Sequence, residues 1–243
     1  MRIPRIYTAQ ELSVGTEILL PEQAGEHAVR VLRLERGHPL ILINGDGCEY
    51  DAELASLAKR AVTAVITQAR AVDREAALSI TLAQSIARGE KMDWILQKAI
   101  ELGVSQIVPL VTERTEVKLD EERAERRMAH WDSVIESACE QCGRTTLPAL
   151  APPQRIDRWL TALDFGGVRL AMVPDGETTV RELPQTNSGV IVVVGPEGGL
   201  SEQDVAVLRQ ADFVGLRLGP RILRTETAGI AVIAALQALH GDF

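Results

Sequence analysis

The sequence predicts an α/β protein in which a small β-rich domain, residues 1–72, precedes a larger domain with a parallel sheet, residues 73–243. Strand patterns joined by a tight turn fill the first part, whereas strands and helices alternate in the second. Val190–Val194 is an uninterrupted run of Val and Ile, which is typical of a central parallel strand covered on both faces. The polar residues 71–75 lack periodicity and mark the boundary.

The N-terminal domain contains short elements. We expect a short helix over residues 22–34 and strands over residues 39–43, 48–57 and 61–67. Asn44-Gly45-Asp46-Gly47, between the first two of these strands, is a strong tight-turn signal. A small β-barrel is the simplest arrangement that uses these strands.

The pattern of the C-terminal domain predicts a parallel sheet with helices on both faces. We expect strands over residues 78–83, 106–111, 168–173, 190–194 and 213–218, and helices over residues 90–102, 120–142, 155–163, 201–210 and 225–239. Gly143 is well placed to end the long second helix. Sheets of this kind bind ligands at the carboxyl ends of their strands, so we expect a site there.

Composition excludes several classes of protein. A net charge of −8 and an aromatic content of 3% argue against binding nucleic acid by bulk electrostatics or by rows of stacked rings. The apolar run Ala228–Leu236 is too short to span a bilayer, and the N-terminus has no secretory apolar region. We therefore expect a soluble, cytoplasmic protein.

The cysteines do not form a disulfide framework, because there are three of them. Cys139 and Cys142 form a C-x-x-C pair, but no second pair and no nearby pair of histidines completes a tetrahedral zinc site. Both residues also continue the apolar stripe of the helix over residues 120–142. Burial in the core is the favoured interpretation, and we expect no metal.

The first candidate ligand loop is Gly195–Gly199, between the buried strand and a helix. Its glycines allow the backbone to approach a ligand closely. The next helix opens with Ser201-Glu202-Gln203-Asp204, a capping box whose two carboxylates would repel a phosphate. The loop therefore favours a ligand without a pyrophosphate, although a well-capped tight turn explains it equally well.

The second candidate loop, residues 218–224, is unusually apolar for a surface connection because it carries Leu218, Ile222 and Leu223. Such side chains cover either the core or a flat ligand such as adenine. The alternative is an apolar lead-in to a buried C-terminal helix.

The two loops together carry a family resemblance. Val194-Gly195-Pro196-Glu197-Gly198-Gly199 followed by Leu218-Gly219-x-Arg221-Ile222-Leu223-Arg224-x-Glu226-Thr227-Ala228 resembles the cofactor signature of the SPOUT methyltransferases, in particular the ribosomal RNA small subunit methyltransferase E family. Similar segments extend over nearly the whole chain, at residues 2–5, 27–33, 91–104, 112–114 and 140–144.

The resemblance implies a C-terminal domain with a trefoil knot and an N-terminal PUA-like β-barrel that binds RNA. It also implies a homodimer that binds S-adenosylmethionine in the knot. Its substrate would be 16S rRNA in the 30S subunit, methylated at ring nitrogen 3 of one uridine. The cofactor has no phosphate, which agrees with the acidic helix start at Glu202 and Asp204.

The resemblance also implies which residues bind the cofactor. They are Met172, Val173, Pro174, Val194, Gly195, Glu197, Gly198, Gly199, Leu218, Gly219, Ile222, Leu223, Arg224, Thr227 and Ala228.

Catalysis requires that the ring nitrogen lose its proton and lie in line behind the methyl group. Arg114 and Arg224 are our candidates for stabilising the uridine anion. Glu197 could act as a base or an orienting group, and a backbone-capping role explains it equally well. We expect Arg114→Ala to lose turnover while keeping cofactor affinity.

RNA contacts must come from local patches. We expect them at Lys91 and Lys98 on one face of the helix over residues 90–102, and in the N-terminal domain at Arg2, Arg5, His27, Arg30 and Arg33. A solvated helix face and a neutral barrel surface are the respective alternatives.

Two other functions fit parts of the pattern. A nicotinamide-dependent oxidoreductase would carry a dinucleotide fingerprint, which the sequence lacks. A non-catalytic RNA-binding factor in ribosome assembly would use the barrel but would not need two ligand loops.

Overall fold

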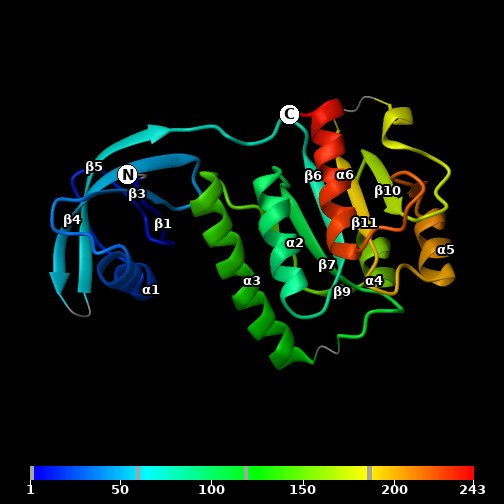
Figure 1. Cartoon of the computed structure of the whole chain (residues 1–243), viewed down its shortest axis with the longest axis horizontal. Helices are drawn as coiled ribbons and strands as arrows, with labels where there is room; N and C mark the ends of the chain where they lie inside the picture. The colour runs from blue at the N-terminus through cyan, green and yellow to red at the C-terminus, as the bar shows by residue number, and fades with distance from the viewer. Residues whose placement is uncertain (1–2, 59–60, 118–119, 185–187) are drawn as a thin grey trace. The chain divides into compact units, whose positions relative to one another are not determined.

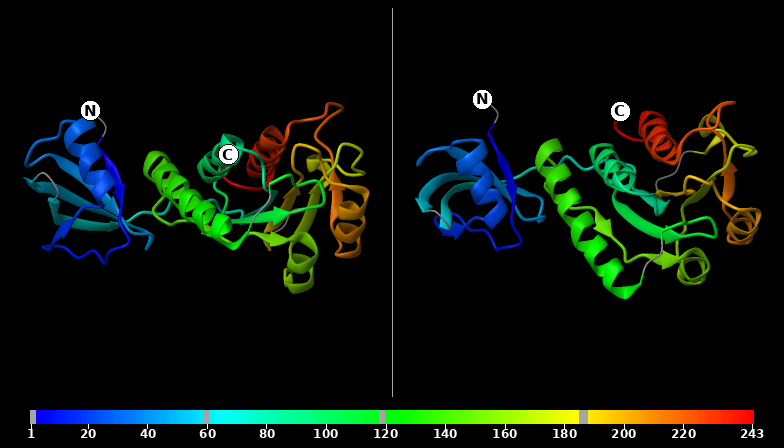
Figure 2. Two further views of the ribbon diagram at one scale, coloured as in Figure 1. Left: turned by 90° about the horizontal axis from the view of Figure 1, so that it is seen from below. Right: turned by 60° about the horizontal axis from the view of Figure 1, so that its bottom comes forward.

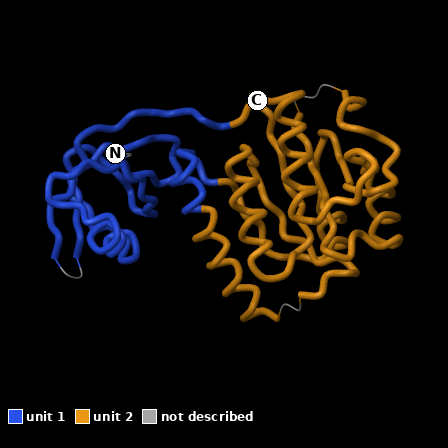
Figure 3. Tube along the Cα trace, viewed as in Figure 1, with its two compact units in different colours: residues 1–75, 136–147 blue, residues 76–135, 148–243 orange. Residues whose placement is uncertain are grey.

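The computed structural model describes residues 3–58, 61–117, 120–184 and 188–243. The chain divides into two compact units, shown in Figure 3: unit 1 is Met1–Glu75 with Glu136–Leu147, and unit 2 is Ala76–Ile135 with Pro148–Phe243. The sequence patterns gave no sign that residues 136–147 would join the N-terminal unit.

Unit 1 is built on a five-stranded sheet in the order β1-β3-β4-β5-β2. Its strands are β1 Arg5–Tyr7, β2 Glu17–Leu19, β3 Pro39–Ile43, β4 Cys48–Ala58 and β5 Ala61–Ala71. The three strands expected from the sequence are confirmed, with β5 longer than predicted. The pairing of β1 with β3 is parallel, and the other pairs are antiparallel.

The helix expected over residues 22–34 is shorter and divided in two. Helix α1, Glu22–Glu26, leads directly into η1, His27–Val31, a single π-helical turn. Gly25 allows the close packing, because a Cβ atom there would lie 3.1 Å from the Cβ atom of Val62. Ala28 and Leu34 are buried in the core of the unit.

A buried carboxylate holds several strands of unit 1 together. The side chain of Glu49 is 2% exposed and pairs with Arg5 at 3.1 Å, Arg70 at 2.6 Å and Arg74 at 2.7 Å. Burial raises the pKa of Glu49, but hydrogen bonds and charges from Arg74 and Arg5 outweigh burial and bring the pKa below its usual value. The carboxylate is therefore ionised near neutral pH.

Residues 136–147 make further polar contacts with the rest of unit 1. Glu140 accepts a hydrogen bond of 2.7 Å from the backbone N–H of Tyr7, and Arg144 pairs with Glu75. Burial raises the pKa of the Glu140 carboxyl and is the largest cause of its shift.

Unit 2 contains the expected parallel sheet, with strands in the order β12-β10-β11-β6-β7-β8 and β9 also paired with β7. The strands are β6 Ile80–Ser85, β7 Gln106–Val111, β8 Ala149–Leu150, β9 Gln154–Arg155, β10 Val168–Met172, β11 Val190–Val194 and β12 Val214–Leu216. Every residue of β11 is buried, as the Val/Ile run predicted. The short strands β8 and β9 were not predicted from the sequence.

Helices cover both faces of this sheet (Figures 1 and 2). Helices α2, Glu90–Glu101, and α6, Thr225–His240, pack together on one face. Trp159 of α4, Ile156–Ala162, and Leu208 of α5, Glu202–Gln210, join a buried cluster with strand residues on the other face. A 3-10 turn, η2, spans Val180–Glu182.

Helix α3, Glu121–Cys142, ends at Gly143 as predicted, with φ of +87° at that glycine. Cys139 is buried, and desolvation raises the pKa of its thiol to about 12, so a reactive thiolate is disfavoured. No group of His, Cys, Asp and Glu residues suited to a metal occurs in the described parts of the chain. Within the same parts, no helix is long and apolar enough to cross a membrane.

Candidate functional site

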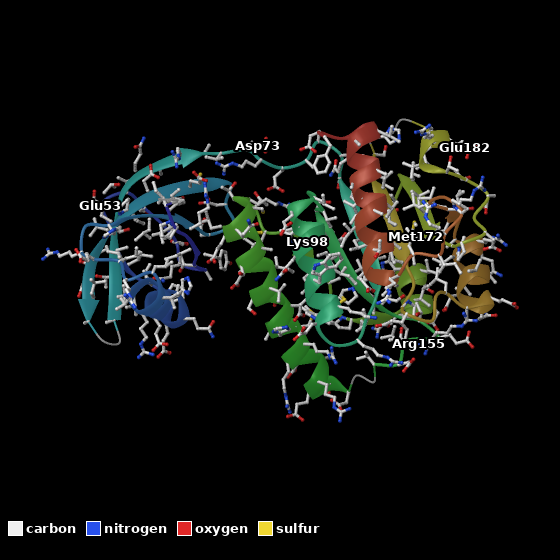
Figure 4. The ribbon with its side chains drawn as sticks, viewed as in Figure 1. Glu53, Asp73, Lys98, Arg155, Met172 and Glu182 are labelled. Atoms are coloured by element: carbon white, nitrogen blue, oxygen red, sulfur yellow. The ribbon has the colours of Figure 1, made fainter. Side chains whose placement is uncertain are left out.

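A cavity of about 630 Å³ lies at the carboxyl ends of the parallel strands in unit 2. Its walls come from Met172–Asp175 at the end of β10, from Val194–Ser201 at the end of β11, and from Ile222, Leu223, Thr225 and Ala228 after β12. Met172, the last residue of β10, is labelled in Figure 4. The volume is typical of small-molecule sites, and the position is where open α/β sheets bind ligands.

Glycines shape the loop after β11. A Cβ atom on Gly195 would lie 2.6 Å from the backbone nitrogen of Leu200, so only glycine fits at the start of the loop. Gly199 has φ of +70°, and its N–H donates to the carbonyl of Pro196 at 2.9 Å. The predicted capping box is present: Ser201 and Asp204 exchange hydrogen bonds of 3.0 Å at the start of α5.

A buried polar chain joins this loop to the first residue of α6. The Oγ1 of Thr225 donates to the carbonyl of Gly195 at 2.6 Å, and the Nε2 of Gln84 donates to the same Oγ1 at 3.0 Å. Gln84 lies in β6 and has no exposed surface. The chain fixes three segments of unit 2 relative to one another at the cavity wall.

Arg114 follows β7 and lines the cavity. Its Nη1 donates to the carbonyl of Gly198 at 2.8 Å, and a Cβ atom on that glycine would lie 3.4 Å from the Cβ of Arg114. Arg114 therefore holds the loop after β11 as well as lining the site.

Glu197 is held by two donors. Its Oε1 accepts from the backbone N–H of Arg88 at 3.1 Å and from the Nζ of Lys91 at 3.2 Å. Burial raises the pKa of Glu197, but these hydrogen bonds outweigh burial and lower it below the usual value. This carboxylate is a poor proton acceptor and a good orienting group.

Lys91 lies between two carboxylates of the site. Besides its bond to Glu197, its Nζ lies 3.9 Å from Oε2 of Glu226, a residue in the first turn of α6. Lys98, labelled in Figure 4, bonds Glu101 of its own helix at 2.8 Å. Of these two lysines, only Lys91 contacts a predicted site residue among the described parts of the chain.

The second loop contributes to the same wall and to a smaller adjoining cavity of about 70 Å³, which includes Leu218 and Gly219. Ile222 is 84% exposed at the rim. The backbone carbonyl of Arg224 caps α6 by accepting from Thr227 at 2.9 Å and from Ala228 at 2.8 Å. The side chains of Arg224 and Thr227 are exposed, and neither residue is among those that line the two cavities.

The structure thus brings most of the predicted cofactor residues together. The larger cavity is lined by Met172, Val173, Pro174, Val194, Gly195, Glu197, Gly198, Gly199, Ile222, Leu223 and Ala228. Sequence reasoning missed other lining residues, namely Asp175, Pro196, Leu200, Ser201, Glu202, Val205, Ala206, Arg209 and Thr225. Pro196 is written out in the first motif, which was an available signal, whereas Thr225 occupies an unspecified position of the second motif, between Arg224 and Glu226.

The lining fits S-adenosylmethionine, which combines a flat base with a positively charged sulfur. Met172, Val173 and Leu223 supply apolar walls. Three carboxylates, Asp175, Glu197 and Glu202, outnumber two guanidinium groups among the described lining residues, which favours a cationic ligand over a phosphate.

The residues of unit 1 that were predicted to bind RNA differ in their exposure and in their partners. His27, Arg30 and Arg33 are exposed around η1, whereas the Arg5 side chain is 16% exposed and paired with Glu49. Arg2 lies outside the described residues.

Comparisons with known proteins agree with this arrangement. Residues 74–237 match the family described as an RNA methyltransferase domain, and residues 20–67 match one described as an RNA methyltransferase PUA domain. A ribosomal RNA small subunit methyltransferase E from Buchnera aphidicola is 33% identical over 99% of this chain and 98% of its own. The chain belongs to the ribosomal RNA small subunit methyltransferase E family.

The family match over residues 20–67 supports the PUA-like character of the N-terminal domain, and solved structures support the same family. A putative methyltransferase from Legionella pneumophila, in complex with bound S-adenosylmethionine, is 40% identical with a TM-score of 0.96 over 100% of both chains. A family member from Neisseria gonorrhoeae bound to S-adenosylmethionine is 38% identical with a TM-score of 0.92, again over 100% of both chains.

Proposed function

We propose that the protein transfers a methyl group from S-adenosylmethionine to ring nitrogen 3 of a specific uridine in 16S rRNA of the 30S subunit. The observation that carries this proposal is the cavity at three strand ends, built from both signature loops of the family. The relatives bound to S-adenosylmethionine support the choice of cofactor.

The cofactor would lie between the loop after β11 and the loop after β12. Bound S-adenosylmethionine supplies a methyl group on a positively charged sulfur. Met172 and Leu223 would cover the base, and backbone groups of Gly195 and Gly199 would contact the nucleoside. We also propose the trefoil knot implied by the family resemblance for this part of the chain.

Two cationic residues would favour the deprotonated uridine. Arg224, the last residue of the second loop, is exposed, and the guanidinium of Arg114 contacts the first loop. A positive charge near the uridine ring lowers the free energy of its anion, which is the nucleophile. Glu197 would orient Lys91 and the backbone of Arg88 rather than accept the proton.

The contact between Arg114 and Gly198 changes the expectation for one variant. Because Arg114 supports the loop after β11, Arg114→Ala should weaken cofactor binding as well as turnover. The sequence-based expectation that cofactor affinity would survive this change is therefore revised.

RNA would be held by local cationic patches. His27, Arg30 and Arg33 are exposed, although Arg30 also pairs with Glu26 at 3.2 Å, and Lys91 lies near the candidate active site. Arg5 would act indirectly, because Glu49 holds its guanidinium. Lys98 and Arg2 stay predictions on the sequence pattern alone.

We also propose that the protein acts as a homodimer. Helix α6 has half-buried small residues such as Ala231 and Ala234, and Trp94 of α2 is 43% exposed. A second copy would cover these apolar groups. We infer a cytoplasmic location from the proposed ribosomal substrate alone.

The decisive test uses 30S subunits that lack this methyl group, incubated with the protein and S-adenosylmethionine. Mass spectrometry of digested 16S rRNA should then show one additional methyl group on a single uridine, located on N3. An unmethylated product, with the protein bound to the subunit, would instead indicate a non-catalytic assembly factor.

A further inference from the structure

The segment after β7 begins with a tight turn that carries Arg114. The N–H of Thr115 donates to the carbonyl of Thr112 at 3.1 Å, which closes a β-turn with Glu113 and Arg114 as its two central residues. The N–H of Thr112 donates to the Oγ1 of Thr115 at 2.9 Å. The direction of the Arg114 side chain therefore depends on how this turn is held in unit 2.

The base of the turn is held by the neighbouring strand β6. The hydroxyl of Thr112 is buried and donates to the Oγ of Ser85, the last residue of β6, at 3.3 Å. Glu113 and Arg114, at the tip of the turn, are exposed instead. The base of the turn is thus fixed to the sheet, whereas the position of its tip depends on other contacts.

Asp204, in the first turn of α5, supplies a contact at the tip. The N–H of Glu113 donates to the Oδ1 of Asp204 at 3.3 Å, and the N–H of Ser201 donates to the Oδ2 at 3.0 Å. Asp204 is 3% exposed, and burying a carboxylate is costly unless its oxygens are hydrogen-bonded. One oxygen therefore caps the helix, and the other holds the turn.

Neither the helix cap nor the turn requires the hydrogen bond between Glu113 and Asp204. In a capping box the acidic residue accepts from the backbone N–H of the N-cap residue, here Ser201, and one oxygen is enough for this. Proline, which has no N–H, is favoured at the turn position that Glu113 occupies. The hydrogen bond therefore connects two segments of the cavity wall and completes neither of them.

The Arg114 side chain makes a second connection between the same two segments. Its Nη1 lies 2.8 Å from the carbonyl oxygen of Gly198 and 3.4 Å from that of Leu200, and it donates to both. Because Glu113 precedes Arg114 directly, a displacement of the Glu113 backbone would move the guanidinium away from these carbonyls. It would also move Arg114 relative to the cavity that it lines.

We propose that Asp204 is a positioning residue for methyl transfer. It holds the backbone of Glu113, and the turn then places the guanidinium of Arg114 at Gly198 and at the cavity. Asp204 is not among the described residues that line the cavity, so it acts through Arg114. The inference rests on the proposed function for the role of Arg114 in turnover, but not for its contact with the loop after β11.

The first test removes the donor of this hydrogen bond. Glu113→Pro lacks the N–H, and Glu113→Ala is the matched variant that loses the same side chain and keeps the N–H. The proline variant should transfer methyl groups to 30S subunits about tenfold more slowly than the alanine variant, and calorimetry should show about threefold weaker binding of S-adenosylmethionine. The melting temperatures of the two variants should agree within about 3 °C, because proline suits this turn position.

The second test changes the acceptor. Asp204→Asn offers one acceptor oxygen, so its NH2 group must face the N–H of either Ser201 or Glu113. The longer of the two bonds, that to Glu113, is the one that we expect to be lost. Asp204→Asn should therefore reduce turnover and cofactor affinity by the same factors as Glu113→Pro.

Both changes are then repeated in Arg114→Ala. If Asp204 acts through Arg114, neither Glu113→Pro nor Asp204→Asn should lower turnover or cofactor affinity by more than about a further twofold in that background. Equal losses with and without Arg114 would overturn the proposal, because they would show a purely structural role for Asp204. Equal turnover and affinity in Glu113→Pro and Glu113→Ala would overturn it as well.

The cofactor measurements also keep this inference separate from the proposed function. If the wild-type protein transfers no methyl group to 30S subunits, the proposed function fails. A loss of cofactor affinity in Glu113→Pro that disappears in Arg114→Ala would still support the positioning role of Asp204.

Discussion

The hydroxyl of Thr225 donates to the carbonyl of Gly195 at 2.6 Å, although the two residues belong to different loops of the site. The amide of Gln84 donates to that hydroxyl and so occupies its acceptor side. A hydroxyl has one proton, which is thereby directed to Gly195. The position of a cavity-lining glycine thus depends on a buried threonine and a buried glutamine.

Replacing Thr225 tests this dependence. Thr225→Val keeps the shape but leaves the Gly195 carbonyl and one N–H of the Gln84 amide without the hydroxyl as partner, at a cost of about 1–3 kcal/mol. Part of this cost should appear as about tenfold weaker binding of S-adenosylmethionine in calorimetry. Thr225→Ser keeps the hydroxyl and should bind within about threefold of the wild-type protein. Equal affinities for the valine and serine variants would refute the role of the hydrogen bond.

Glu197→Gln tests whether this carboxylate accepts the proton. Hydrogen bonds from Arg88 and Lys91 keep its pKa low, so it stays ionised at a pH where a glutamate side chain usually becomes protonated, and it binds protons weakly. The variant should reduce turnover less than about tenfold and leave the pH dependence of the rate unchanged. A loss of more than about a hundredfold, partly recovered at high pH, would instead identify Glu197 as the base.

Arg224→Ala tests charge stabilisation without disturbing the fold. The backbone of Arg224 caps α6, and truncating its exposed side chain leaves those hydrogen bonds in place. Turnover should fall about a hundredfold, as for the loss of one donor to a developing anion, while cofactor affinity stays within about twofold. Arg114→Ala is the comparison variant and should weaken both, because Arg114 also holds Gly198. Methyl transfer at the wild-type rate in Arg224→Ala would remove this residue from the mechanism.

Glu49→Gln should destabilise unit 1. It leaves three arginines without their shared carboxylate, at a cost of about 2 kcal/mol, below that of fully buried pairs because Arg70 and Arg74 remain partly exposed. The pKa of Glu49 is lowered from 4.5, so its contribution is complete above that pH and is lost as the pH falls through the folded-state value. Denaturant unfolding should therefore show a smaller loss of stability on acidification in the variant. Identical acid sensitivity in both proteins would contradict this account.

The sequence was sufficient to predict those elements that depend on residues close together in the chain. The Val/Ile run of β11, the glycines of the loop after it and the Ser201–Asp204 capping box all occur where the sequence indicated. Secondary-structure propensity and residue spacing were therefore sufficient to predict each of them.

Contacts between residues far apart in the chain could not be predicted from local sequence patterns. Gln84 and Thr225 are 141 positions apart, and only the folded sheet brings them together. The strand β1 has three residues and gains its hydrogen bonds by parallel pairing with β3. Likewise, no periodicity in α3 indicates that Glu140 accepts from Tyr7, because the two residues are 133 positions apart in the chain.

The central claim is that the cavity after β10, β11 and β12 holds S-adenosylmethionine. A crystal structure of the protein grown with saturating S-adenosylmethionine tests it most directly. We predict density for the whole molecule between Met172–Pro174, Gly195–Gly199 and Leu223. Crystals in which this cavity is empty, or in which the molecule binds elsewhere, would contradict the claim.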